Sequence, residues 1–171
     1  MDQGVRRIGR HGWRRRVIGA SGCAILIGAL AGCGAPAPTL SSGEAIDEYA
    51  PLLDEVESVL DEAYPEISWT RDGEQRVQGG GDGEPCVVVF PTLESPTSLW
   101  GAAGGWDAVA EVLDPVLSER GFPPLAEDEL QGGWTGVSAV GDDGADIRMW
   151  DKSSTTIALR VDVTDEGCAA P

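Results

Sequence analysis

Histidine is almost absent from this sequence, since His11 is the only one among 171 residues. It lies in an arginine-rich N-terminal leader, and the chain after that leader contains no imidazole. The Ser-His-Asp and Cys-His mechanisms need an imidazole to take up a proton, and zinc sites use it as their usual nitrogen ligand. We therefore expect no catalytic residues, no metal and no cofactor in the main part of the chain.

Basic residues are also scarce, with 12 Lys and Arg against 29 Asp and Glu. The leader contains six of the basic residues but only one acidic residue, Asp2. The chain after residue 32 keeps six basic and 28 acidic residues, a net charge of −22. Such a charge opposes binding to nucleic acid, because its recognition depends on Lys and Arg side chains that neutralise phosphates.

A long hydrophobic run is missing as well. The most apolar stretch, residues 17–30, is interrupted by small and polar side chains at Gly19, Ser21, Gly22 and Cys23. A stable membrane span needs about 20 predominantly apolar residues. This stretch is therefore typical of a signal peptide rather than of a transmembrane helix.

The apolar stretch leads into Leu30-Ala31-Gly32-Cys33, the pattern of a bacterial lipobox. It predicts a signal peptide over residues 1–32 and a diacylglyceryl lipid on the thiol of Cys33. Cys23 fits this role less well, because no branched apolar residue stands three positions before it. Arg14-Arg15-Arg16 leaves twin-arginine export open beside the Sec route. We expect a lipid-anchored protein on the extracytoplasmic face of the cell membrane.

Two of the four cysteines remain once Cys23 leaves with the leader and Cys33 carries lipid. In an oxidising compartment this pair, Cys86 and Cys168, indicates a disulfide, while reactive or metal-binding thiols are the alternative. Cys86 begins one expected strand, and Cys168 follows the end of the last strand at Val163. If those strands are antiparallel neighbours, the two sulfurs come within bonding reach.

After the signal peptide we expect a short tether and one domain. The tether, residues 33–40, is rich in Pro and Ala, and its central six residues reach only about 20 Å when extended. Residues 41–171 are enough for one hydrophobic core but not for two.

Two segments have apolar residues at helical spacing. The first spans 43–63 and opens with Ser41 and Glu44, a capping-box pair. The second spans 106–117, and Gly121 marks its end. We expect a kink or a break at the proline inside each helix, Pro51 and Pro115.

Other segments have the composition or alternation of strands. They are 67–70, 86–90, 135–140, 145–150 and 155–163. The glycine-rich stretch 78–84 indicates a flexible loop, and a Pro/Ser-rich connection precedes the second helix. Together these features predict an α+β two-layer domain with two main helices packed on a largely antiparallel sheet of about four to five strands.

The order of these features resembles the LppA-like lipoproteins of actinobacteria. The likeness comprises the lipobox, a first helix leading to Trp69, Cys86 at the start of a strand, Trp106 opening a helix that ends at Gly121-Phe122, and Gly167-Cys168 near the terminus. It spans nearly the whole chain after the leader. The resemblance implies a small anchored domain without an assigned activity or known catalytic residues.

Three kinds of function fit this sequence. The first is a membrane-anchored cell-envelope lipoprotein that is not an enzyme and binds a partner or stabilises an assembly. The second is an extracytoplasmic binding module for a cation, a cationic peptide or a sugar. The third is a hydrolase that uses a pair of carboxylates, as glycosidases do. The absence of histidine and of any nucleophile motif favours the first.

A few residues are candidates for the second function. Asp142, Asp143 and Asp146 could offer oxygen ligands to Ca²⁺, and an exposed Trp100 could stack on a sugar ring. Asp-Asp-Gly is also ordinary turn chemistry, and tryptophans usually build the core of a small domain. Glu127-Asp128-Glu129 is likewise more typical of a solvated loop than of a metal site. We therefore assign none of these residues to a metal or cofactor.

We expect Cys33→Ala to release the protein from the membrane or to leave it as an uncleaved precursor. Two acyl chains anchor a protein stably, because each buried CH₂ adds about 0.8 kcal/mol. Detergent-phase partitioning and mass spectrometry of the N-terminus measure the effect. A wild-type protein that begins at another residue and has no lipid adduct would contradict the prediction.

Overall fold

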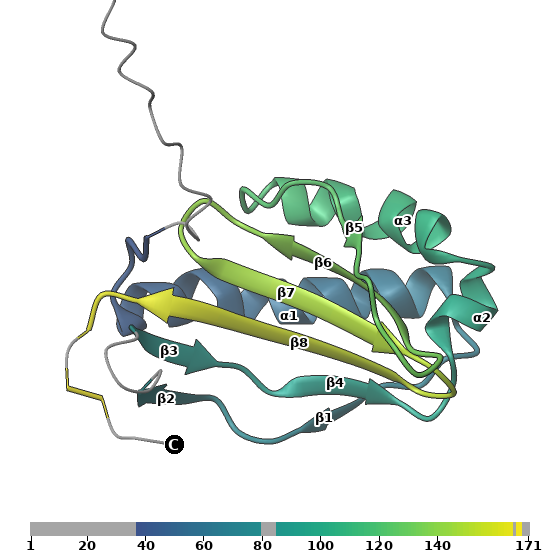
Figure 1. Cartoon of the computed structure of the whole chain (residues 1–171), viewed down its shortest axis with the longest axis horizontal. Helices are drawn as coiled ribbons and strands as arrows, with labels where there is room; N and C mark the ends of the chain where they lie inside the picture. Colours follow the sequence, from purple (N-terminus) through teal and green to yellow (C-terminus); the bar gives the residue numbers. More distant parts are fainter. Residues whose placement is uncertain (1–36, 80–84, 166, 169–171) are drawn as a thin grey trace, which may run out of the picture. The chain divides into compact units, whose positions relative to one another are not determined.

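The computed structural model describes residues 37–79, 85–165 and 167–168, which form three helices and one eight-stranded antiparallel sheet (Figure 1). The helices are α1 (Ser42–Ala63), α2 (Leu99–Ala103) and α3 (Trp106–Ser118). The strands are β1 (Thr70–Asp72), β2 (Arg76–Gly79), β3 (Cys86–Val89), β4 (Thr92–Ser95), β5 (Ala126–Glu127), β6 (Thr135–Val140), β7 (Ala145–Asp151) and β8 (Thr155–Val163). The predicted α+β class with two main helices, α1 and α3, is confirmed, whereas the predicted number of strands was too low.

The first helix begins with the capping box that its sequence predicts. The Ser41 side chain accepts a hydrogen bond from the Glu44 amide, and the Glu44 carboxylate accepts one from the Ser41 amide. The bonds that the Ser41 hydroxyl and amide donate also hold the pKa of Glu44 below its ordinary value. The start of α1 is therefore determined by local sequence.

Both long helices continue through their prolines, so the expected breaks at Pro51 and Pro115 are not found. Each proline removes one amide donor, which leaves the carbonyl of Asp47 or Glu111 without its helical partner. Both prolines are exposed, and water can bond to these carbonyls on the solvent side. After α3, Gly121 has a φ of 79°, a backbone conformation that favours glycine and ends the helix as predicted.

The longest strand, β8, organises the sheet. One of its edges pairs with β7 from Thr155 to Val161, and the other pairs with β3 and β4 (Figure 1). Its odd-numbered residues from Thr155 to Val163 are buried, while the even-numbered ones are partly or fully exposed. The alternation predicted for this strand is confirmed, and it gives the sheet one covered and one open face.

The extended segment that forms β3 and β4 is interrupted once, and so is the segment that forms β1 and β2. These interruptions explain why the sequence predicted too few strands. β3 and β4 lie end to end against β8, and Pro91 between them has no amide to continue the ladder. Their partners β2 and β1 are divided in the same way, near Gly73 with its φ of 79°. Each of these two extended segments is therefore divided into two strands.

Several segments differ from their predicted structure. The expected strand 67–70 contributes only Thr70 to β1, because Ile67 is buried in the core before the strand begins. The expected loop 78–84 starts with the last two residues of β2, and residues 80–84 lie outside the described part. The Pro/Ser-rich connection contains β4 and α2, and β5 was not expected. These short elements depend on pairing or packing with distant segments.

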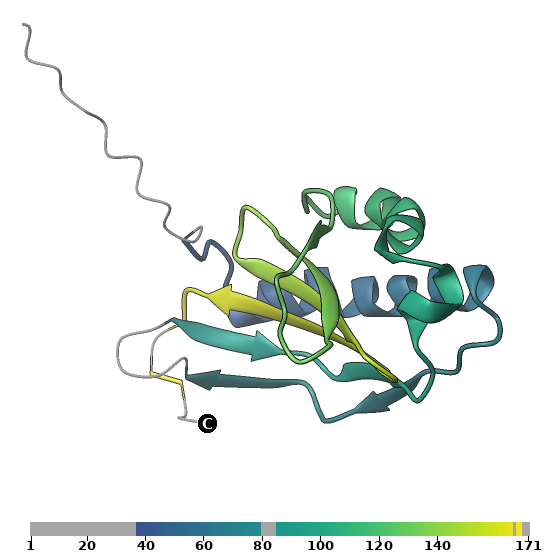
Figure 2. The same ribbon diagram turned by 45° about the vertical axis from the view of Figure 1, so that its right-hand side comes forward.

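The core lies between the sheet and the two long helices. α1 contacts α3, and it also packs on β3 and β8. Figure 2 shows the helices on the same side of the sheet. Side chains from both layers are fully buried there, including Leu53 and Leu113 from the helices and Ile147, Ile157 and Leu159 from the strands. The opposite face of the sheet has no helix among the described residues.

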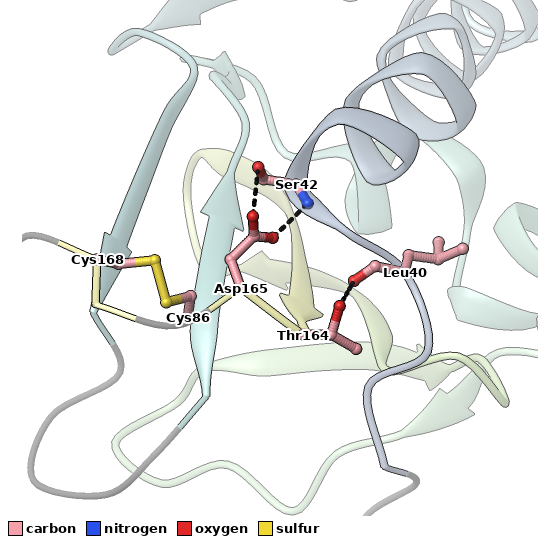
Figure 3. The surroundings of a disulfide bond; sticks show 6 residues. All are labelled: Leu40, Ser42, Cys86, Thr164, Asp165 and Cys168. Atoms are coloured by element: carbon pink, nitrogen blue, oxygen red, sulfur yellow. Dashed lines mark hydrogen bonds between the residues drawn. A yellow bond between two sulfur atoms is a disulfide. The ribbon is translucent and has the colours of Figure 1, made fainter.

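The two ends of the domain are joined beside a disulfide (Figure 3). Cys86 pairs with Cys168, which confirms the predicted bond, and Cys86 lies opposite Val163 in the antiparallel register that the prediction assumed. Nearby, the Thr164 amide donates to the Leu40 carbonyl, and Asp165 accepts from the Ser42 amide at the start of α1. The segment after β8 is therefore fastened both to β3 and to the entry of α1.

We expect Cys86→Ser or Cys168→Ser to lower the free energy of unfolding by roughly 2 to 5 kcal/mol. The bond joins cysteines 82 residues apart, so it restricts the unfolded chain strongly. Urea unfolding of each variant measures the loss, and membrane attachment should be unchanged. Two reactive thiols in the denatured, unreduced wild-type protein would contradict the pairing.

Candidate functional site

The open face of the sheet is hollowed into a groove of about 650 Å³. We call it the open groove; its lining includes Arg76, Val89, Asp146, Arg148, Trp150, Ala158 and Arg160. These side chains come from β2, β3, β7 and β8, and Figure 1 shows β7 and β8 passing in front of α1. The volume falls within the range typical of small-molecule sites.

Strand register brings the charged residues of the groove together. Asp146 on β7 lies directly opposite Arg160 on β8, and Arg148 lies opposite Ala158 in the next outward-facing pair. On the other side of β8, Arg160 faces Val89, which in turn faces Arg76 on β2. Neighbouring strands are about 4.8 Å apart, so Arg76 lies roughly 10 Å across the sheet from Arg160.

Asp146 holds two arginines at the centre of the groove. Its Oδ2 lies 2.9 Å from Nη2 of Arg148 and 2.8 Å from Nη2 of Arg160. The Nε atoms of both arginines also donate to the Asp146 carboxylate at 3.0 Å. The Asp146 side chain is only 6% exposed, whereas those of Arg148 and Arg160 are 43% and 56% exposed. A buried carboxylate thus orients two guanidinium groups whose other edges reach solvent.

This groove reverses the charge of the surrounding protein. Its lining contains three arginines, Arg76, Arg148 and Arg160, against two carboxylates, Asp146 and Asp162. The hydrogen bond and the charge of Asp146, together with the charge of Asp128, raise the pKa of the Arg148 guanidinium. The groove is therefore locally positive in a strongly acidic chain.

The other basic residues of the described chain are engaged elsewhere. Arg71 forms ion pairs of 2.6 Å with Asp54 and Glu57 of α1. Arg120 pairs with Glu55 of the same helix at 2.8 Å. Nζ of Lys152 donates to the Gly132 carbonyl and lies 5.8 Å from the centroid of the Trp134 ring. Only in the open groove do several cations share one hollow of the described surface.

The strand next to Trp150 has a glycine where there is no room for a side chain. Gly136 lies opposite Trp150 in the sheet. A Cβ atom at residue 136 would lie 2.6 Å from the Met149 carbonyl oxygen and 2.9 Å from Cδ1 of Leu130. The close approach of the Met149 carbonyl therefore requires glycine at residue 136.

The aspartates considered as Ca²⁺ ligands do not form one site. Asp146 is bound by its two arginines, and Asp143 accepts a hydrogen bond from the Tyr49 hydroxyl at 2.5 Å. Burial and the Asp143 carboxylate raise the pKa of that phenol. Asp142 is exposed in the turn between β6 and β7. Within the described residues, no group of carboxylates, thiols or imidazoles could hold a metal ion.

The other candidates from the sequence lie apart from the groove. Trp100 is 46% exposed, and its backbone amide donates to Asp151, a buried carboxylate that also binds the Ser98 and Thr155 hydroxyls. These bonds fasten α2 to the turn between β7 and β8. Asp128 accepts a hydrogen bond from the Ser138 hydroxyl. Trp100 remains an accessible aromatic surface, while Asp151 and Asp128 stabilise local structure.

Cys33 lies outside the described residues, as do the whole signal peptide and the first residues of the tether. Of the helices that are described, none has the length and apolar character to cross a membrane.

The carboxylate at the centre of the groove is engaged by arginines. Both oxygens of Asp146 accept hydrogen bonds from them. This arrangement is suited to orienting the two guanidinium groups.

Sequence reasoning missed the arginines of the groove, although a signal was present. Arg148 and Arg160 occupy outward-facing positions of two strands that were predicted, with small or apolar residues beside them. Pairing the last two predicted strands as a hairpin would have placed Arg160 opposite Asp146. Arg76 could not be found in this way, because β2 was not predicted.

Comparisons with known proteins add one structural likeness. The chain matches no model of a protein family and no curated protein sequence. A crystal structure of a DUF4853 family protein from Actinomyces odontolyticus ATCC 17982 is similar, with a TM-score of 0.46 and 19% sequence identity. The match covers 78% of this chain and 71% of that chain.

We expect Asp146→Asn to lower the free energy of unfolding by about 1 to 3 kcal/mol, because it removes the buried charge that pairs with two arginines. The figure is modest since both arginines are partly solvated and water can replace some of the lost interaction. Asp142→Asn is the matched control, because it removes the same charge from an exposed turn and should change stability by no more than about 0.5 kcal/mol. If urea unfolding shows that both variants change the free energy of unfolding equally, the ion pairs of Asp146 add no stability beyond the effect of net charge.

Proposed function

We propose that this chain is a lipid-anchored lipoprotein of the cell envelope that is not an enzyme and binds its ligand in the open groove. The observation that carries the proposal is the groove itself, a hollow of about 650 Å³ on a sheet face that no described helix covers. Its oriented arginines and half-buried Trp150 offer polar and apolar contacts together. Such a combination is typical of a binding site.

Anchoring is supported by the sequence before the domain. The leader, the lipobox and the short tether favour attachment through Cys33 on the extracytoplasmic face. The disulfide between Cys86 and Cys168 agrees with an oxidising compartment, where such bonds persist. The layout resemblance to LppA-like lipoproteins belongs to this proposal as well.

A binding role without catalysis is favoured by the chemistry of the groove. Its central carboxylate is occupied by Arg148 and Arg160, and the chain after the leader contains no histidine to act as a base. The groove thus offers contacts for recognition without a group poised to transfer a proton.

A photo-crosslinking amino acid at Val87, on the rim of the groove, tests the proposed function in the living envelope. We expect p-benzoylphenylalanine at residue 87 to form a discrete adduct with a ligand or partner. The same amino acid at Ala63, an exposed position at the end of α1, is the control. Ala158→Trp fills the groove and should abolish the adduct at residue 87.

Two results would contradict this function. The first is an adduct at residue 63 without one at residue 87. The second is an adduct at residue 87 that persists when Ala158→Trp fills the groove.

A further inference from the structure

We propose that the open groove binds a small organic monocarboxylate, with Arg148 and Arg160 pairing with the carboxylate and Trp150 packing on its apolar body. The inference rests on the proposed function and adds the chemical class of the ligand. Its starting point is a surplus of positive charge at the centre of the groove. One guanidinium would be enough to neutralise Asp146, but two are bound to it.

The geometry of the ion pairs leaves both arginines ready for a second anion. Each meets Asp146 through Nε and Nη2, which leaves the edge with Nη1 turned away from that carboxylate. Both side chains are about half exposed, so a ligand can reach these edges. A guanidinium matches the two oxygens of a carboxylate with parallel hydrogen bonds. Asp146 thus acts as a positioning residue for the arginines.

The charge balance favours a single negative charge on the ligand. The three arginines and two aspartates that line the groove carry one net positive charge, and a monocarboxylate neutralises it. A phosphate dianion would leave excess negative charge on a protein that carries −22 after its leader. A neutral ligand would leave the positive charge unpaired. The observations therefore favour a carboxylate over a phosphate.

The remaining surface of the groove is suited to an apolar body of modest size. Trp150, Val89 and Ala158 line it beside the arginines, and Ala158 leaves room opposite Arg148. A volume of about 650 Å³ holds a small molecule rather than a folded partner. The ligand is thus expected to combine one carboxylate with an alkyl or aromatic group.

The experiment follows the arginine Nε–H signals of the full chain in neutral detergent by ¹⁵N NMR. The probes are 4-phenylbutyrate and octanoate, each compared with its primary amide, which has the same shape without the charge. We expect saturable shifts of Arg148 and Arg160 at millimolar carboxylate, since small ligands of this size bind weakly. The amides should shift these signals at least tenfold more weakly.

Variants separate the groove from general charge attraction. Arg148→Gln and Arg160→Gln should each weaken carboxylate binding at least about tenfold, because each removes a charged hydrogen-bond donor. Arg71→Gln, on the side of the sheet that faces α1, should leave binding unchanged. Asp146→Asn should weaken carboxylate binding, since the arginines lose their orientation. Each carboxylate should still bind more tightly than its amide.

Several outcomes would overturn the assignment. They are equal shifts with carboxylate and amide, tighter binding of phenyl phosphate than of 4-phenylbutyrate, an equal loss in Arg71→Gln, or no shift at millimolar carboxylate. If crosslinks at residue 87 form while the carboxylates fail, the binding function stands and only the ligand class is wrong. If both fail, the groove is not the binding surface.

Discussion

The antiparallel pairing of β8 on both edges is the interaction on which the rest of the structure depends. It holds β7 on one side and the β3 and β4 ribbon on the other. Because side chains alternate along a strand, this single register places Ile157, Leu159 and Val161 under the helices and Arg160 on the open face. If β8 shifted its register by one residue, its core side chains would face the groove and its groove side chains would face the core.

The disulfide and the contacts around it secure this register at one end. Cys86 begins the strand that faces the end of β8, and the segment after β8 returns through Asp165 to the start of α1. The start of the first helix and the end of the central strand thus meet in one corner of the domain (Figure 3).

Electrostatics gives the two faces of the sheet different roles. On the side that faces the helices, Arg71 and Arg120 form ion pairs with carboxylates of α1 and neutralise part of its negative charge. These two arginines therefore have a structural role. On the open side, Asp146 gathers two arginines that remain partly exposed. A chain with few basic residues thus concentrates half of those that follow its leader in one hollow.

The sequence by itself determined the features that depend on neighbouring residues. These are the capping box of α1, the glycine stop after α3, the three strands of the last meander and the alternation of β8. The cysteine pair was also predictable, because only one pairing remained. Only the tertiary structure decided the short strands β1, β2, β4 and β5, the continuity of the helices through exposed prolines, and the groove. Each depends on contacts between segments far apart in the chain. The conformational preferences of neighbouring residues do not include the free energy of those contacts.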